Sequence, residues 1–158
     1  GRRVSSISAI HGGHAGMTRC RCPRVRKAST CPASGFGRIE QRRTATPEEL
    51  RHDLDRQDII SLNLTRAVQT GVDIAVHLLA DTDERAPTTM GEAFEALVAQ
   101  SLISEPPGKR LRAAVGFRNI VVHRYQAIDW TIVHALTHTG VEDFRAFAAA
   151  IAPLLDAD

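Results

Sequence analysis

Apolar residues recur every three or four positions along most of the chain after residue 46, and no stretch shows the strict alternation of a half-buried strand. This spacing is typical of amphipathic α-helices. Polar residues and prolines divide the pattern into segments. We predict helices over about 47–80, from 89 to about 102, from 104 through 118–125, from 129 to about 138, and from 139 to about 155.

Capping signals mark the starts of these segments. Thr46-Pro47-Glu48-Glu49 and Thr89-Met90-Gly91-Glu92 each combine an N-cap threonine with a glutamate three residues later, the arrangement of a capping box. Asp129 and Thr139 are placed to cap the last two helices. Four capped helices with short connections predict an all-α, antiparallel four- to five-helix bundle. The expected core positions of its longest helix are Leu50, Leu54, Leu62, Val68, Val72, Ala75 and Leu79.

Length and composition agree with one small helical domain. The chain has 158 residues, of which 43% are hydrophobic and only 4% aromatic, which favours aliphatic helix packing over a β-sandwich. No run of 18 apolar residues occurs, so no membrane-spanning helix is expected. Since no signal-peptide layout is visible either, we expect a cytoplasmic location.

Charge divides the chain into two unlike parts. Residues 1–45 hold ten basic residues and one acidic residue, a net charge of +9, whereas 46–158 hold ten basic and seventeen acidic residues, a net charge of −7. We predict that 1–37 form a poorly ordered basic arm and that 38–158 form the helical domain. The arm is either an electrostatic tether for RNA or a non-native reading frame, with Met17 as a candidate start.

The three cysteines lie in this arm. Cys20, Cys22 and Cys31 follow His11 and His14. The C-x-C spacing is a poor zinc signature, because structural zinc sites usually take a C-x2–4-C pair. We therefore predict no metal site and no cofactor.

Chemistry concentrates in one helical segment, where Arg118, His123 and Tyr125 lie within eight residues. On an ideal helix Leu111, Val115, Arg118, Val122 and Tyr125 fall on one stripe, so a cation lies where a core residue belongs. An arginine buried there needs a bound anion, an acidic neighbour or an interface. One alternative is a structural ion pair in a helical bundle with no enzymatic role.

The segment FRNIVVHRY, from Phe117 to Tyr125, resembles the R-x4-H-x-Y signature of HepT-type toxins of the HEPN superfamily. Stretches at 58–77, 91–98 and 141–151 resemble the same family in the right order, so the likeness covers about 38–156. It implies a metal-independent endoribonuclease toxin of a type VII toxin–antitoxin system, paired with a minimal nucleotidyltransferase antitoxin of the MntA type. It also implies that the antitoxin attaches AMP to Tyr125.

General chemistry assigns roles to the other residues of this motif. His123 suits acid–base work near neutral pH, Arg118 suits the charge of a phosphorane, and Asn119 suits orientation of the scissile phosphate. Five residues separate Arg118 from His123 by about 140° on an unbroken helix. Either the helix unwinds near His123, or Arg118 reaches across, or a second copy completes the cleft. The resemblance implies the last solution, a homodimer.

Polar residues on the helix from 47 are candidates for a supporting role. Asp58 and Asn63 are both candidate partners for Arg118. Asp73 and His77 stand at i, i+4, a spacing that favours a structural pair and leaves a supporting role beside Arg118 as the second interpretation.

Function remains open between an enzyme and a binding module. The first interpretation is a ribonuclease acting on tRNA or mRNA. The alternative is a non-catalytic HEPN-like nucleotide- or phosphate-binding adaptor, or an inactive remnant.

Overall fold

The computed structural model describes residues 35–80, 82 and 85–155. Within these ranges the chain consists of helices and connecting turns and contains no strand. After a first helix over 35–41 come α2 (Pro47–Arg51), α3 (Leu54–Leu79), α4 (Met90–Ala99), α5 (Glu105–His123), the 3-10 turn η1 (Tyr125–Ala127), α6 (Trp130–Ala135), the π-helical η2 (Leu136–Gly140) and α7 (Val141–Leu155).

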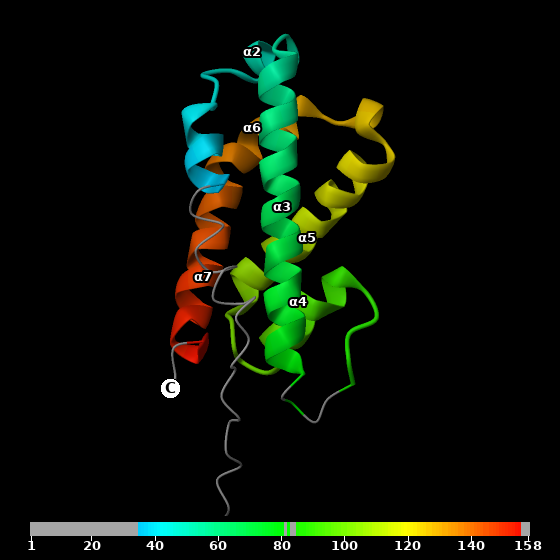
Figure 1. The fold of residues 1–158 in the computed structure, drawn as a ribbon, viewed down its shortest axis with the longest axis vertical. Helices are drawn as coiled ribbons and strands as arrows, with labels where there is room; N and C mark the ends of the chain where they lie inside the picture. The colour runs from blue at the N-terminus through cyan, green and yellow to red at the C-terminus, as the bar shows by residue number, and fades with distance from the viewer. Residues whose placement is uncertain (1–34, 81, 83–84, 156–158) are drawn as a thin grey trace, which may run out of the picture.

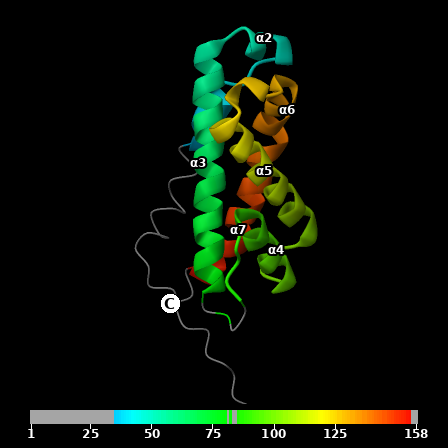
Figure 2. The ribbon, with the colours of Figure 1, turned by 90° about the vertical axis from the view of Figure 1, so that its right-hand side faces the viewer.

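The helices form an antiparallel bundle around α3. Figure 1 shows α3 and α7 running in one direction and α5 in the opposite one. Figure 2 shows that α5, α6 and α7 all lie on one side of α3, with α2 close to α6 at one end. The predicted all-α bundle is confirmed.

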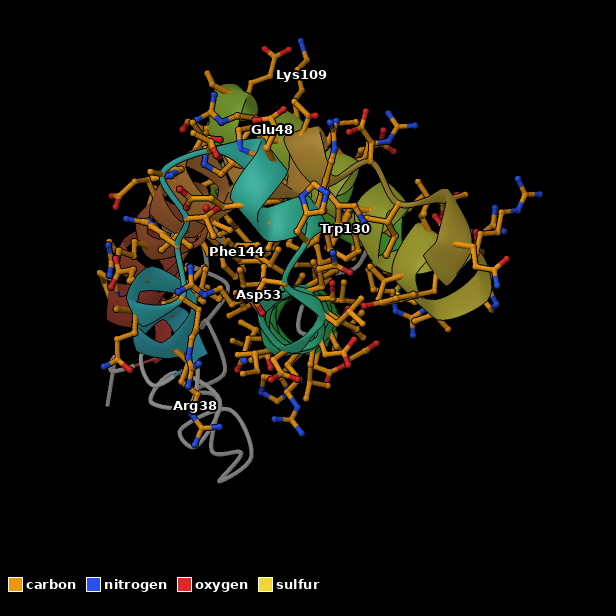
Figure 3. All side chains as sticks on the ribbon, turned by 90° about the horizontal axis from the view of Figure 1, so that it is seen from above. Arg38, Glu48, Asp53, Lys109, Trp130 and Phe144 are labelled. Atoms are coloured by element: carbon orange, nitrogen blue, oxygen red, sulfur yellow. The ribbon has the colours of Figure 1, made fainter. Side chains whose placement is uncertain are left out.

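Aromatic and aliphatic side chains fill the space between α3, α4, α5 and α7. The Phe94 and Phe147 rings meet edge to face with centroids 5.7 Å apart, and Phe144 lies against Phe36 of the first helix. Figure 3, viewed down α3, places Phe144 among the interior side chains, whereas Arg38 and Lys109 point outward. The core therefore depends on a few phenylalanines that link helices distant in sequence.

Both predicted capping boxes are present. Thr46 accepts a hydrogen bond from the Glu49 amide, and Thr89 accepts one from the Glu92 amide. The glutamate carboxylates reach back to amides just before each helix, at 3.1 Å for Glu49 and 2.8 Å for Glu92. Caps of this kind contribute about 1 kcal/mol each.

The single helix predicted from 47 to about 80 is wrong, because it breaks at His52 and Asp53. Asp53 accepts a hydrogen bond from the Arg56 amide and caps α3 as a new helix. The buried Gln57 amide donates to the carbonyls of Leu50 and Arg51 at 2.8 and 2.9 Å. These bonds pair carbonyls at the end of α2 that have no partner within the helix, so the break leaves few backbone groups without a hydrogen bond.

Asp129 caps α6 as predicted, but the last helix does not begin separately. Residues Leu136–Gly140 form a π-helical turn that continues α6 into α7. The Thr139 hydroxyl donates to the Ala135 carbonyl and does not cap a new helix. A π-turn inserts one extra residue per turn and lets the chain bend without ending the helix.

Three smaller expectations differ from the structure. Leu54 and Leu62 were expected in the core but are 73% and 49% exposed, because Leu54 is the first residue of α3 and Leu62 lies on the side of α3 roughly opposite most of its buried residues. The helix from 89 ends at Ala99, and Ser101 then takes a positive φ of 57°. The first helix already includes 35–37, which the sequence analysis assigned to the arm. The cysteines and the rest of the arm lie outside the described residues.

Replacing Phe94 with alanine is expected to lower the free energy of unfolding by about 3–5 kcal/mol. Its ring is fully buried and packs on Phe147 and against Gly71. Chemical denaturation of the purified chain measures the change. As a control, Leu54→Ala should shift the free energy by no more than about 0.5 kcal/mol, since surface substitutions usually cost little. Equal losses in the two variants would contradict this description of the core.

Candidate functional site

The second half of α5 carries the predicted site residues. The helix is continuous to His123, and Arg124 then leaves it with φ −144° and ψ 48°. Figure 1 shows this end of α5 leaning away from α3. Arg118, Asn119 and His123 are therefore held on one rigid element that projects from the bundle.

The stripe predicted along α5 is buried only in its first half. Leu111 and Val115 are in the core, whereas Val122 and Tyr125 are 49% and 40% exposed. Ile120, which lies about 200° around the helix from Val122, is also 41% exposed. The last turns of α5 thus present apolar side chains on more than one side, a feature typical of surfaces that bind another molecule.

Arg118 is half-buried and incompletely paired. One terminal nitrogen, Nη1, donates to Asn119 Oδ1 at 3.2 Å. The Nε atom is buried and has no hydrogen-bond partner among the described residues. An unpaired buried donor costs roughly 1–3 kcal/mol, and a charged one costs more. The guanidinium therefore has unused capacity to bind an acceptor.

The partners expected for Arg118 within the chain lie elsewhere. Asp58 accepts a hydrogen bond from the Tyr125 hydroxyl. Asn63 is buried, donates to the Ile59 carbonyl at 2.7 Å and lies near Gly35 of the first helix. Among the described residues, neither forms a hydrogen bond with Arg118. Their supporting roles stay predictions.

Asp73 lies further along α3 than the residue that contacts Tyr125. It lies on α3 roughly 22 Å along the axis from Asp58, the residue that contacts Tyr125. Its carboxylate accepts a hydrogen bond from the Gln69 side chain at 3.0 Å. This contact is with a neighbour on the same helix, and both the pairing of Asp73 with His77 and its supporting role beside Arg118 stay predictions.

Tyr125 is the best-anchored residue of the motif. It lies in η1, and its hydroxyl donates to Asp58 Oδ1 on α3 at 2.6 Å. Its ring meets the Trp130 ring edge to face, with centroids 6.0 Å apart. Neither contact is evident from the sequence. An exposed aspartate and a tryptophan carry no sequence signal that would link either of them to this tyrosine.

The environment of Tyr125 keeps its hydroxyl protonated. Partial burial, the hydrogen bond to Asp58 and the negative charge of Asp58 together raise the pKa of Tyr125 to about 12, while the nearby Ser61 hydroxyl acts in the opposite direction. The neutral phenol is therefore the form present at physiological pH.

A spectrophotometric titration should show this shift directly, because the chain contains one tyrosine. We expect phenolate formation with a midpoint of about 12 in the folded chain and about 10 in denaturant. The pKa of Tyr125 is higher in the folded chain than in the unfolded chain, so the protonated hydroxyl stabilises the folded state. This contribution to the free energy of unfolding is complete below the unfolded pKa and is lost as the pH rises through the folded pKa. Asp58→Asn should lower the folded midpoint, and an unchanged midpoint would contradict the contact.

His123 is exposed at the end of α5. Its ring forms no hydrogen bond or ion pair with the described part of the chain. An unrestrained imidazole at a helix terminus can approach a bound substrate and exchange protons with it. The described residues thus present a histidine and an incompletely paired arginine on the end of α5, followed by an anchored tyrosine in η1.

A family model described as ribonuclease HepT-like matches residues 36–151. This span includes every described element that builds the site. The chain belongs to the ribonuclease HepT-like family. A relative in this family, the mRNA nuclease HepT of Shewanella oneidensis, is 33% identical over 103 residues, which are 65% of this chain and 77% of that protein. The resemblance inferred from the sequence is confirmed.

Solved structures give the same assignment. A toxin–antitoxin crystal structure with AMP-PNP has a TM-score of 0.75 and 28% identity, covering 82% of this chain and 98% of that one. The tri-AMPylated HEPN toxin of S. oneidensis, in complex with its MNT antitoxin, has a TM-score of 0.76 and 28% identity, covering 83% and 98%. YutE of Bacillus subtilis, with a TM-score of 0.72 and 13% identity over 85% and 90%, shares the fold alone.

Two further features of this HepT-like chain concern metals and membranes. The described residues contain no cluster of three or more His, Cys, Asp or Glu side chains arranged to hold a metal ion. None of the helices in the described ranges has both the length and the apolar character needed to cross a membrane.

Proposed function

We propose that this chain is a metal-independent endoribonuclease toxin of a type VII toxin–antitoxin system. The observation that carries the proposal is Arg118, a half-buried arginine with an unpaired Nε, five residues before an exposed histidine on the same helix. An arginine held in this way is suited to a phosphate group, and a free histidine to proton transfer. Membership of the ribonuclease HepT-like family supports the same reaction.

The cleavage reaction uses the ribose 2′-hydroxyl as nucleophile. His123 removes the proton of the 2′-hydroxyl as it attacks the adjacent phosphorus, and a histidine returns a proton to the leaving 5′-oxygen. Arg118 stabilises the negative charge that develops on the phosphorane oxygens, which its planar guanidinium can contact in pairs. Asn119, hydrogen-bonded to Arg118, positions the guanidinium and the scissile phosphate.

A second copy of the chain completes this site. Because α5 is continuous through His123, Arg118 and His123 point about 140° apart and cannot both face one phosphate from a single helix. A two-fold dimer places the Arg118 of one copy near the His123 of the other. The exposed Leu62, Ile120 and Val122 supply apolar surface for this interface.

Attachment of AMP to Tyr125 neutralises the toxin. The partner is a minimal nucleotidyltransferase antitoxin of the MntA type. Each AMP adds a negatively charged phosphodiester seven residues after Arg118, where it competes with RNA phosphates for the guanidinium. The tri-AMPylated state of the S. oneidensis toxin supports this assignment.

Induced expression with and without the antitoxin tests the proposal. The chain alone should arrest growth and fragment cellular RNA, and the purified chain should cleave RNA in the presence of EDTA. Co-expression with the antitoxin should restore growth and add AMP to Tyr125, as measured by mass spectrometry. Tyr125→Phe should remain toxic under co-expression. A soluble chain that binds RNA but leaves it intact would favour the alternative, a phosphate-binding adaptor or an inactive remnant.

A further inference from the structure

The contact between Tyr125 and Asp58 has no role in RNA cleavage as described above. It joins η1 to the second turn of α3 through a hydrogen bond of 2.6 Å between the phenolic hydroxyl and Asp58 Oδ1. A distance this short is typical of a hydroxyl that donates to an ionised carboxylate. Asp58 therefore contacts the one atom of Tyr125 that an AMP group would modify.

The surroundings leave Tyr125 partly exposed while they hold its ring in place. Tyr125 is 40% exposed, and Trp130 holds its ring edge to face. Another carboxylate close in sequence, Asp129, is already used, since it caps α6 by accepting from the Thr131 amide at 2.9 Å. Asp58 is thus the carboxylate positioned at the phenolic oxygen.

We propose that Asp58 is the proton acceptor for modification of Tyr125 by a nucleoside triphosphate. This inference rests on the proposed function of Tyr125 as the AMP acceptor and adds the residue of the toxin that assists its own modification. The toxin then supplies both the nucleophile and the base, while the antitoxin supplies the bound triphosphate.

The reaction balances as a single displacement. The Tyr125 oxygen forms a bond to the α-phosphorus, the bond from this phosphorus to the bridging oxygen of the β-phosphate breaks, and pyrophosphate leaves. The phenolic proton passes to the Asp58 carboxylate and then to water. Once esterified, the Tyr125 oxygen has no proton to donate, and the new phosphodiester and Asp58 carry charges of the same sign. Modification therefore also breaks the link between η1 and α3.

A neutral phenol needs such an acceptor. With a pKa of about 12, the phenolate fraction at pH 7 is on the order of 10⁻⁵, so attack proceeds from the protonated form. As the oxygen–phosphorus bond forms, the hydroxyl becomes strongly acidic, and a carboxylate already in hydrogen-bond contact accepts the proton without rearrangement.

Asp58 has two effects of opposite sign, and this makes the inference testable. By raising the pKa of Tyr125 it disfavours the phenolate, so a purely structural contact would slow the attack, and Asp58→Asn would accelerate it. As a proton acceptor it speeds the attack, so Asp58→Asn would slow it. Asparagine keeps the size and the accepting oxygen but loses the basicity.

The first experiment measures single-turnover AMP transfer to the purified chain by a minimal nucleotidyltransferase antitoxin with ATP and Mg²⁺. We expect Asp58→Asn to slow transfer by roughly 10²-fold or more with unchanged antitoxin affinity, and to regain rate as the pH rises and phenolate forms. Asp55→Asn, which alters an exposed aspartate one turn away on α3, is the matched control and should transfer at the wild-type rate.

A second experiment does not depend on the partner. N-acetylimidazole acetylates tyrosine hydroxyls, and the chain has one tyrosine. Near neutral pH the wild type should be O-acetylated about tenfold faster or more than Asp58→Asn. Equal or faster modification of Asp58→Asn in either experiment overturns the inference, as does a loss of transfer explained entirely by weaker antitoxin binding. A wild type that is acetylated as expected but never receives AMP refutes the proposed neutralisation and leaves the proton-acceptor role standing.

Discussion

Replacing His123 with alanine is expected to slow RNA cleavage by roughly 10²–10⁴-fold, the usual effect of removing a general acid–base group. His123 is the titratable side chain at the projecting end of α5, and Arg118 cannot substitute for it because a guanidinium keeps its proton. In cells, the variant should permit growth on induction. With purified chain, the rate of loss of a defined RNA substrate measures the effect, and Asn119 and Arg118 remain to bind the RNA.

A matched histidine variant separates chemistry from folding. His52 lies exposed at the end of α2, with Nδ1 2.7 Å from the Glu48 carbonyl oxygen, and belongs to no part of the site. His52→Ala should cleave RNA at close to the wild-type rate. Since His123 makes no hydrogen bond or ion pair with the described residues, His123→Ala should also unfold at the wild-type temperature. Equal cleavage by the two variants would assign the acid–base role to another residue.

Local signals in the sequence predicted much of the fold. The capping boxes at Thr46 and Thr89 are present because each uses residues within four positions of one another. The break before α3 depends on more than its local cap at Asp53. It depends on Gln57, whose buried side chain bonds to the carbonyls that α2 leaves open, and a glutamine in an apolar pattern does not indicate this.

The sequence could place the candidate residues that share one helix, but it could not predict the contact that joins two helices. Arg118, Asn119 and His123 all lie on the last turns of α5. The pairing of Tyr125 with Asp58 joins residues 67 positions apart, and the angle between α3 and α5 decides it. Periodicity placed Arg118 and Tyr125 on one buried stripe, but it carries no information about where a helix leaves its bundle. The exposed Val122 results from that departure.

Arg118→Met is expected to reduce RNA cleavage by roughly 10²–10³-fold while leaving the melting temperature unchanged or raising it. Methionine preserves the length and apolar stem of the side chain. It removes the buried Nε that lacks a partner, and replacing a poorly paired buried charge by an apolar group is often stabilising by about 1 kcal/mol or more. A cleavage assay and thermal unfolding of the same preparation measure both effects.

Opposite changes in activity and stability distinguish a functional arginine from a structural one. Arg145→Met is the control, because Arg145 pairs with Glu40 and Glu142 on the surface, and exposed pairs contribute about 1 kcal/mol or less. It should cleave RNA normally. A marked loss of stability in Arg118→Met would instead show that the guanidinium is paired, either within the chain or across the proposed dimer. Measuring the oligomeric state of that variant separates these cases, since an interface arginine would also be needed for the dimer to form.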